Sequence, residues 1–302
     1  MVWVREELNE KKSIFNASFE ESITLENDGF RKLQQEQHDK IAKKVINGTP
    51  TFGFKMQAVI LTLLFPFCFN YLLSLASTKL TNYQSNGLDF QPSNSNFLTW
   101  QVYLILLCLW LLLVIVGKHF NQAFVLPYRY QFHTFTYMII LYIEIDLLII
   151  GLLLSNLPFF IVLAIMMIWI ILIYFMVAVE LRGIRKIMYN ESNEPRKIDK
   201  IAKLISMYGM GILGVAVIVK RLVSMFLGET SNSLEEIGIL LAVIIMNIIM
   251  PAVVIFIGTP YFLHAYYKLK YPELYRKYEG KSVEEWYGKK YLKKHKELTE
   301  NE

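Results

Sequence analysis

The sequence predicts an all-α, polytopic membrane protein with six transmembrane helices. Two observations predict this fold: the chain contains six long apolar runs, and 54% of its 302 residues are hydrophobic, which leaves no stretch for a large soluble domain. Each run holds close to the roughly 20 residues that a helix needs to cross about 30 Å of hydrocarbon. The runs cover residues 56–76, 97–116, 135–154, 158–179, 205–227 and 237–260.

The basic residues between the runs predict the orientation of the chain. The tail before residue 56 has nine, the segment 117–134 has two, the segment 180–204 has seven and the tail after residue 260 has ten, so 28 of the 31 lie on one face. Only Lys79 lies in the opposite segments. The positive-inside rule therefore places both termini in the cytoplasm, and we expect the membrane to be a plasma membrane.

Three regions follow from these spans. They are a cytoplasmic N-terminal tail (1–55), a six-helix transmembrane domain (56–262) and a basic, aromatic C-terminal tail (263–302). The formal net charge is +5, and the basic residues flank the spans. We therefore expect them to face the anionic lipids of the inner leaflet rather than nucleic acid. A protein partner or a second copy of the chain is a further expected partner.

The connections between spans add detail. Only three residues, 155–157, separate the third and fourth runs, so these two helices should form a tight antiparallel hairpin and pack against each other. Pro195 and the apolar spacing behind it predict one helix of about thirty residues that continues into the fifth run.

The C-terminal tail predicts an amphipathic helix. Ser282 and Glu285 form the pattern of a capping box. One face behind it carries Val283, Trp286, Tyr287 and Tyr291, and the charge comes from Lys289, Lys290, Lys293 and Lys294. Such a helix either adsorbs on the inner leaflet through Trp286, Tyr287, Tyr291, Lys290 and Lys294 or docks on the protein's own loops or on a partner.

Two carboxylates near the middle of the third run are the sharpest local signal. Glu144 and Asp146, with Tyr142 nearby, lie in an otherwise apolar segment. Each acid at a helix centre costs about 3 kcal/mol on insertion, so neighbouring helices must satisfy both of them. Because residues i and i+2 point about 200° apart, both faces of this helix should be screened from lipid, which makes it a central helix.

Two readings of these acids remain open. They form either a buried polar network that fixes helix packing, or an ion, proton or polar-substrate site in a hydrated cavity. Lys220 and Arg221 in the fifth run are candidate counter-charges, although simple helix geometry places Lys220 about 9 Å deeper than Asp146. Lys220 and Arg221 can also extend toward the outer headgroups.

Prolines and asparagines inside the first and sixth runs are a second polar signal. Pro66 with Asn70, and Pro251 with Asn247, could line a cavity, but helix packing is the default interpretation.

The sequence contains no recognisable catalytic motif. It has no HExxH, GxSxG or P-loop pattern, and its five histidines lie outside the apolar runs. The match of residues 209–214 to GxGxxG falls inside an apolar helix, where small residues serve helix packing. Cys68 and Cys108 also lie inside spans. We therefore expect no enzyme activity, metal or cofactor.

The expected function is that of a multi-pass membrane transport or channel-like component with a polar site on the third helix. The alternative is a non-catalytic membrane interaction protein, such as a toxin-immunity protein or an accessory subunit of a secretion or permease complex. A hydrated route to Glu144 or Asp146 distinguishes the first from the second.

The predicted orientation can be tested by cysteine labelling. Single cysteines introduced in the C-terminal tail should be protected from an impermeant thiol reagent added to intact cells, because the basic residues place that tail inside. Labelling of the tail in intact cells would show that the orientation is wrong.

Overall fold

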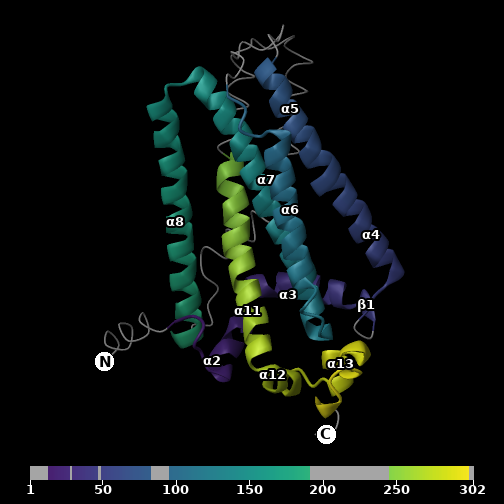
Figure 1. Cartoon of the computed structure of the whole chain (residues 1–302). Helices are drawn as coiled ribbons and strands as arrows, with labels where there is room; N and C mark the ends of the chain where they lie inside the picture. The colour runs from purple at the N-terminus through teal and green to yellow at the C-terminus, as the bar shows by residue number, and fades with distance from the viewer. Residues whose placement is uncertain (1–12, 28, 47–48, 83–94, 191–244, 299–302) are drawn as a thin grey trace, which may run out of the picture.

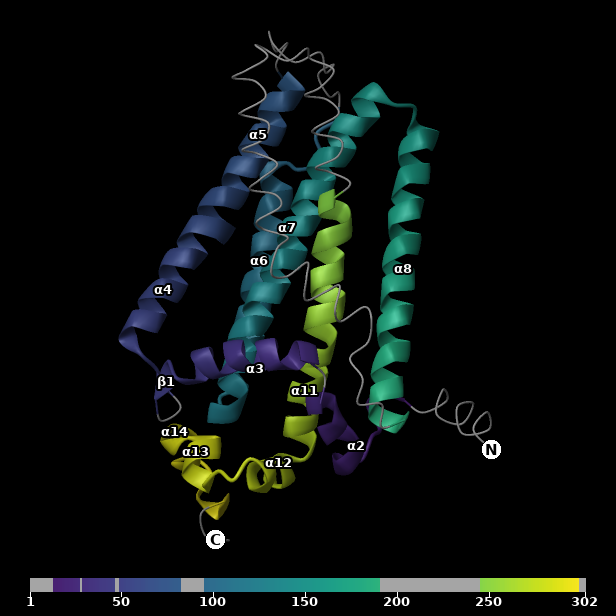
Figure 2. The same cartoon turned by 180° about the vertical axis from the view of Figure 1, so that it is seen from behind.

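The computed structural model describes residues 13–27, 29–46, 49–82, 95–190 and 245–298. These residues are mostly helical and form a bundle of long helices above a layer of short ones (Figures 1 and 2). Five helices are long and apolar enough to cross a membrane: Phe52–Lys79, Trp100–Gly117, Ala123–Leu154, Phe159–Tyr189 and Ile245–Lys270. They coincide with the first four predicted spans and with most of the sixth. The fifth predicted span, with Lys220 and Arg221, lies outside the described residues.

The first long helix combines three segments, α4 (Phe52–Thr62), η2 (Leu63–Phe69) and α5 (Asn70–Asn82). The middle segment is π-helical because Pro66 lies inside it and has no backbone N–H to donate. The widened turn is closed by the backbone N–H of Asn70, which donates to the carbonyl oxygen of Phe65. The helix therefore continues through the proline and presents Asn70 to the bundle interior.

Helix α6 (Trp100–Gly117) packs closely against α7 (Leu126–Asn156). Thr99 caps α6 by accepting a hydrogen bond from the N–H of Val102. A methyl group at Gly117 would lie 2.7 Å from the His133 ring, so glycine permits this close approach. The buried apolar residues between the two helices are Tyr103, Leu106, Leu107, Trp110 and Ile140.

The segment 117–134, predicted as a loop, is largely helical. It contains the short helix η3 (Ala123–Val125), and α7 begins at Leu126 with Pro127 in its first turn. Proline is favoured there because its missing N–H would have no partner in the first turn. The apolar run predicted a span that starts at residue 135, whereas α7 starts about two turns earlier.

Helix α8 (Phe159–Asn190) is joined to α7 by the short predicted connection, but most of its apolar part is separated from the other described long helices (Figures 1 and 2). Only 6% of its most apolar window is buried. The expectation that α7 and α8 form a closely packed pair is therefore wrong, because α7 packs mainly against α6. The other contacts of α8 are with α2 (Phe19–Ile23), η1 (Thr24–Asn27) and η4 (Val253–Gly258).

The last long helix contains a second π-helical segment, η4, shortly after Pro251, and continues as α11 (Thr259–Lys270). A methyl group at Gly258 would lie 3.1 Å from the ring of Phe135 on α7, so the two helices touch closely here. The helix runs past Pro260, the predicted end of the sixth span, because Leu263 and Tyr267 are buried against the chain's own tails.

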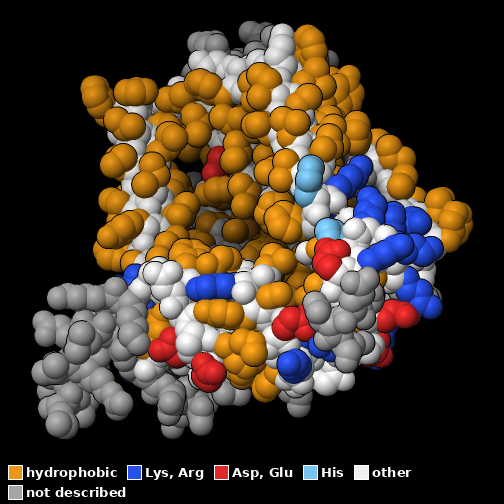
Figure 3. Space-filling model, turned by 60° about the horizontal axis from the view of Figure 1, so that its bottom comes forward, with side chains coloured by type: hydrophobic (Ala, Val, Ile, Leu, Met, Phe, Trp, Pro, Cys, Tyr) orange, Lys and Arg blue, Asp and Glu red, His pale blue; other side chains and the backbone are white. Residues whose placement is uncertain are grey.

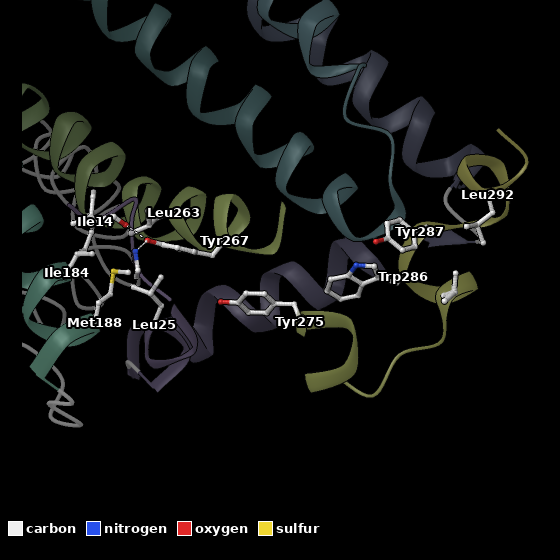
Figure 4. Packing of buried hydrophobic residues seen from close by; sticks show 12 residues of the cluster. Ile14, Leu25, Ile184, Met188, Leu263, Tyr267, Tyr275, Trp286, Tyr287 and Leu292 are labelled. Atoms are coloured by element: carbon white, nitrogen blue, oxygen red, sulfur yellow. Dashed lines mark hydrogen bonds between the residues drawn. The ribbon is translucent and has the colours of Figure 1, made fainter. Parts of the chain in front are cut away.

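Both tails lie at the same end of the bundle and pack together (Figure 4). We call this assembly the tail cap; it comprises residues 13–27, the last turns of α8 and α11, α12 (Pro272–Tyr278), and the two short helices of residues 283–292. The Tyr267 hydroxyl is fully buried, donates to the carbonyl oxygen of Ile14 and accepts from the N–H of Ala17 at 3.0 Å. The tails are therefore parts of one folded unit.

The remaining N-terminal elements connect the tail cap to α4. Helix α3 (Gly29–Ala42) lies across the end of the bundle, and a two-strand hairpin follows it. Its strands are β1 (Val45–Ile46) and β2 (Thr49–Pro50), paired antiparallel with Val45 opposite Pro50. Helix α3 covers most of the segment 31–46, in which the sequence has a thin set of apolar residues.

The C-terminal tail forms a shorter helix than the sequence predicts. The capping box at Ser282 and Glu285 is present, but α13 (Val283–Tyr287) ends at Gly288, whose φ of 84° favours glycine, and α14 (Lys289–Leu292) starts in a new direction. Trp286 is 1% exposed and stacks on the ring of Phe124 at 4.5 Å between centroids. The continuous amphipathic helix is therefore not formed.

The other predicted interface residues divide between protein and solvent. The Tyr287 hydroxyl donates to the Glu273 carboxylate at 2.8 Å. Tyr291 is half-buried, and its ring stacks on the ring of Tyr287. Lys290 and Lys294 are exposed. Of the two predicted roles for this segment, the aromatic side chains of α13 fit docking on the protein itself.

The tail cap should depend on the Tyr267 hydroxyl. We expect Tyr267→Phe to cost about 1–3 kcal/mol, since it leaves the buried N–H of Ala17 and the carbonyl group of Ile14 without their partner. Under native conditions a protease should then cleave residues 13–27 faster. Tyr278→Phe, at an exposed ring of the same cap, is the control and should leave the rate unchanged. Equal rates for wild type and Tyr267→Phe would contradict this role.

Candidate functional site

Glu144 is the most deeply buried acid of the central helix α7. Its side chain is 0% exposed, and neither carboxylate oxygen has a hydrogen-bond partner among the described residues. The Asn70 amide lies near the carboxyl group, outside the geometry of a full hydrogen bond. A carboxylate in such a place is costly unless it is protonated or paired with a cation.

Three helices supply the polar groups on the Glu144 side of α7. Tyr137, two turns before Glu144, donates its hydroxyl to the Asn70 side-chain oxygen at 2.8 Å. Tyr103 on α6 donates to the backbone oxygen of Phe67 at 3.1 Å, in the π-helical turn that precedes Asn70. Both hydroxyls lie within electrostatic reach of the Glu144 carboxyl group. The widened turn thus gains a partner for its carbonyl groups and holds Asn70 beside Glu144.

Asp146 faces a different helix, as the spacing of the two acids predicts. The Tyr142 hydroxyl donates to the side-chain oxygen of Asn247 at 2.9 Å, and both side chains lie within bonding reach of the Asp146 carboxyl group. Asn247 is buried and lies one turn before Pro251. Asp146 therefore has two hydrogen-bonding side chains within reach, whereas the Glu144 carboxyl group has Asn70 in the described part of the chain.

The two acids form related clusters on opposite sides of α7. Each cluster combines a carboxyl group, a tyrosine of α7 and an asparagine from a helix that contains a π-helical segment. The structure brings together the predicted residues Glu144, Asp146 and Tyr142 with the asparagines that the sequence placed beside prolines. It leaves open the pairing with Lys220 and Arg221, which lie outside the described residues.

Tyr137 and Tyr103 were not among the predicted site residues. Tyr137 precedes Glu144 by seven residues, which places it two turns away on the same face of the helix. That spacing could have identified it. Tyr103 had no comparable signal, because its role depends on the distant carbonyl groups that Pro66 frees.

A second polar cluster joins α3 to the tail end of α7 and α11. His264 bonds to Glu26 at 2.9 Å through one ring nitrogen and to the Tyr128 hydroxyl at 3.0 Å through the other. The His38 ring lies 4.6 Å from the Tyr128 ring and bonds to the Tyr261 hydroxyl at 3.1 Å. In the sequence these histidines lie outside the apolar runs. His38 and His264 are nevertheless buried links between the N-terminal segment and the bundle.

The electrostatic surroundings keep His38 neutral. Burial lowers the pKa of His38 well below its ordinary value, and the charges of Lys268, His264 and Lys281 lower it further. A cavity of about 250 Å³ lies beside His38 and Trp286. Among the charged residues that line it, Lys268 and Lys281 pair with Glu279, and Glu284 pairs with Lys289, whereas Glu285 accepts hydrogen bonds from Ser282. The described residues contain no group of three potential metal ligands.

The fold and site define a helical protein with five candidate membrane-spanning helices and a central helix that carries two buried acids. No protein-family model, curated protein or solved structure matches the chain.

Docking of α3 should weaken in acid. Because the pKa of His38 is lowered in the fold, its contribution to stability is present above the ordinary value of about 6.5 and is lost as the pH falls below it. Hydrogen exchange of the α3 amides should then show an opening free energy that falls by up to about 1.4 kcal/mol per pH unit.

His38→Gln should remove this pH dependence while keeping a hydrogen-bonding side chain near Tyr261. The exposed-tail variant His295→Gln serves as the control and should retain it. The other charged groups around His38 are Lys268, Lys281, His264 with its partner Glu26, and Glu279. An unchanged pH slope in His38→Gln would assign the effect to one of them.

Proposed function

We propose that this protein is a multi-pass membrane transport or channel-like component whose α7 carboxyl groups bind a proton or a small cation. The observation that carries the proposal is the complete burial of Glu144 without a hydrogen bond to its carboxylate oxygens from any described residue. Ionised acids inside a membrane generally mark ion or proton sites, since an unpaired charge there costs several kcal/mol, roughly 3 on insertion scales.

The chemistry of the Glu144 cluster supports reversible binding. A proton on Glu144 removes the buried charge, and a small cation would find further oxygen ligands in the Asn70 amide and the backbone of the π-helical turn. Asp146, with Tyr142 and Asn247 as partners, forms a second polar station on the other side of the same helix. We assign no catalytic step to either cluster.

The proposal includes six spans in a plasma membrane, with both tails in the cytoplasm. The described tails lie at one end of the bundle, as this topology requires. The described part of α8 runs down to that same end, and the described part of the last long helix also runs down to it, as Figure 1 shows. One further span between these two helices accounts for both directions. The 28 basic residues on one face then meet the anionic inner leaflet.

The alternative, a non-catalytic interaction protein, is favoured by one observation on α8. This helix exposes aromatic residues at its start, Phe159 and Phe160, and near its middle, Tyr174 and Phe175. Such a surface suits a partner helix or a second copy of the chain as well as it suits lipid. In that case the acids of α7 serve packing alone.

Neutral variants of the two acids separate these functions. In proteoliposomes with an imposed membrane potential, we expect Glu144→Gln to lower proton or sodium uptake at least tenfold, because it removes the only group in its cluster that can carry the charge. The variant should fold as well as wild type or better, since a costly buried charge is gone. Asp146→Asn should lower uptake less.

The matched control for this measurement is Glu284→Gln, which removes an exposed carboxylate from the C-terminal tail. Protein incorporation and melting temperature should be measured for every variant. Full uptake in both α7 variants would contradict the transport proposal and favour the interaction protein. Wild-type vesicles without uptake of either ion would contradict it directly.

A further inference from the structure

Four basic residues gather at the tail end of the bundle, outside the tail cap. They are Lys44 after α3, Lys55 on α4, Lys118 after α6 and Arg129 on α7, and we call them the basic corner. Figure 3 shows Lys and Arg side chains gathered on one flank of this end, directly beside apolar side chains. The Thr51 N–H donates to the backbone oxygen of Lys44, and the Lys55 N–H donates to that of Thr51. These hydrogen bonds connect the backbones of the two lysines through Thr51.

Aromatic contacts hold two of these cations in place. The Lys44 ammonium lies 5.4 Å from the centroid of the Phe54 ring, and the Arg129 guanidinium lies 5.5 Å from that of Tyr130. The rings of Phe54 and Tyr130 meet edge to face at 4.6 Å. Lys44 and Arg129 are therefore positioned around one aromatic pair that joins α4 to α7. Arg129 also donates to the backbone oxygen of Phe120, just beyond Lys118.

No acid neutralises the basic corner within the described residues. None of its four cations forms an ion pair there, whereas lysines of the tail cap are paired, as Lys268 is with Glu279 and Lys289 with Glu284. Four cations without a paired acid, two of them held in place by aromatic rings, favour an anion with more than one oxygen acceptor.

The surface next to the basic corner is apolar. Helices α4 and α6 diverge toward the tail end, and both views show the same separation (Figures 1 and 2). The exposed apolar residues in the tail-end halves of these helices are Phe52, Met56, Val59 and Ile60 on α4 and Leu109, Leu112, Leu113 and Val116 on α6. A soluble anion would leave these apolar side chains exposed, whereas the acyl chain of a lipid would bury them.

We propose that the basic corner binds the headgroup of one anionic phospholipid, whose acyl chains lie against the diverging parts of α4 and α6. The phosphate group contacts Lys44 and Arg129 across the Phe54–Tyr130 pair, and Lys55 and Lys118 complete the positive surface. This site differs from general attraction to a charged leaflet, because it has a fixed position and a stoichiometry of one lipid.

Native mass spectrometry of the full-length protein in a neutral detergent tests this proposal. Phosphatidylglycerol is titrated against the protein, and phosphatidylcholine is the neutral comparison. One phosphatidylglycerol should bind at least tenfold more tightly than phosphatidylcholine. Lys44→Gln with Lys55→Gln should lower this affinity about thirtyfold, because each basic residue near an anionic headgroup contributes about fivefold. Lys55→Gln alone should lower it about fivefold, and its exposed side chain makes the change safe for folding.

Helix α8 supplies a matched control. Arg182→Gln with Lys186→Gln removes the same charge from exposed positions near the tail end of the bundle, and should leave the affinity within twofold of wild type. Equal losses in the two pairs would overturn the site in favour of diffuse charge. Unchanged affinity in the Lys44 and Lys55 pair would also overturn it. Displacement of the lipid by millimolar inorganic phosphate would show a soluble-anion site instead.

Discussion

The arrangement of the long helices meets one constraint, the need to keep two carboxyl groups of α7 away from the apolar outer surface of the bundle. Glu144 and Asp146 point to opposite sides of the same helix, so other helices must border both sides near its middle. Helices α5 and α6 cover the first side, and the helix that contains Asn247 covers the second. Helix α8 carries no such requirement along its apolar part, and there it stands apart from its neighbours.

A second organising feature is that the two tails bury each other's apolar residues in one core. Ile14, Ala17 and Leu25 would be exposed on the N-terminal segment alone, and Trp286 would be exposed on the C-terminal one. Together with the ends of α8 and α11 they form a core that is rich in aromatic residues. The buried histidines extend this core to α3, so the described N-terminal segment is held against the bundle both at Glu26 and at His38.

The sequence predicted the features that depend on local chemistry. Apolar runs located the described spans, the spacing of Glu144 and Asp146 predicted that they face different neighbours, and Ser282 with Glu285 predicted the start of α13. Asn70 and Asn247 were recognised through the nearby prolines, although their partners were not.

Features that depend on contacts between distant residues could not be predicted in the same way. Nothing near Tyr267 in the sequence indicates that its hydroxyl meets Ile14, and the burial of His38 depends on three separate helices. The aromatic face of residues 283–291 was recognisable, but the pattern is the same whether that face meets lipid or protein. Gly288 is visible in the sequence, but its positive φ, which ends α13 and turns the backbone, is set only in the folded chain.

The union of the two tails also has a consequence for biosynthesis. The contact between Ile14 and Tyr267 joins residues 253 positions apart, and the ribosome needs about 12 to 50 s to make that length of chain. During this interval the N-terminal segment is present without the surface that buries it. The cap can therefore close only after the last long helix has been made, so chains that stop early keep Ile14, Ala17 and Leu25 exposed to proteases and chaperones.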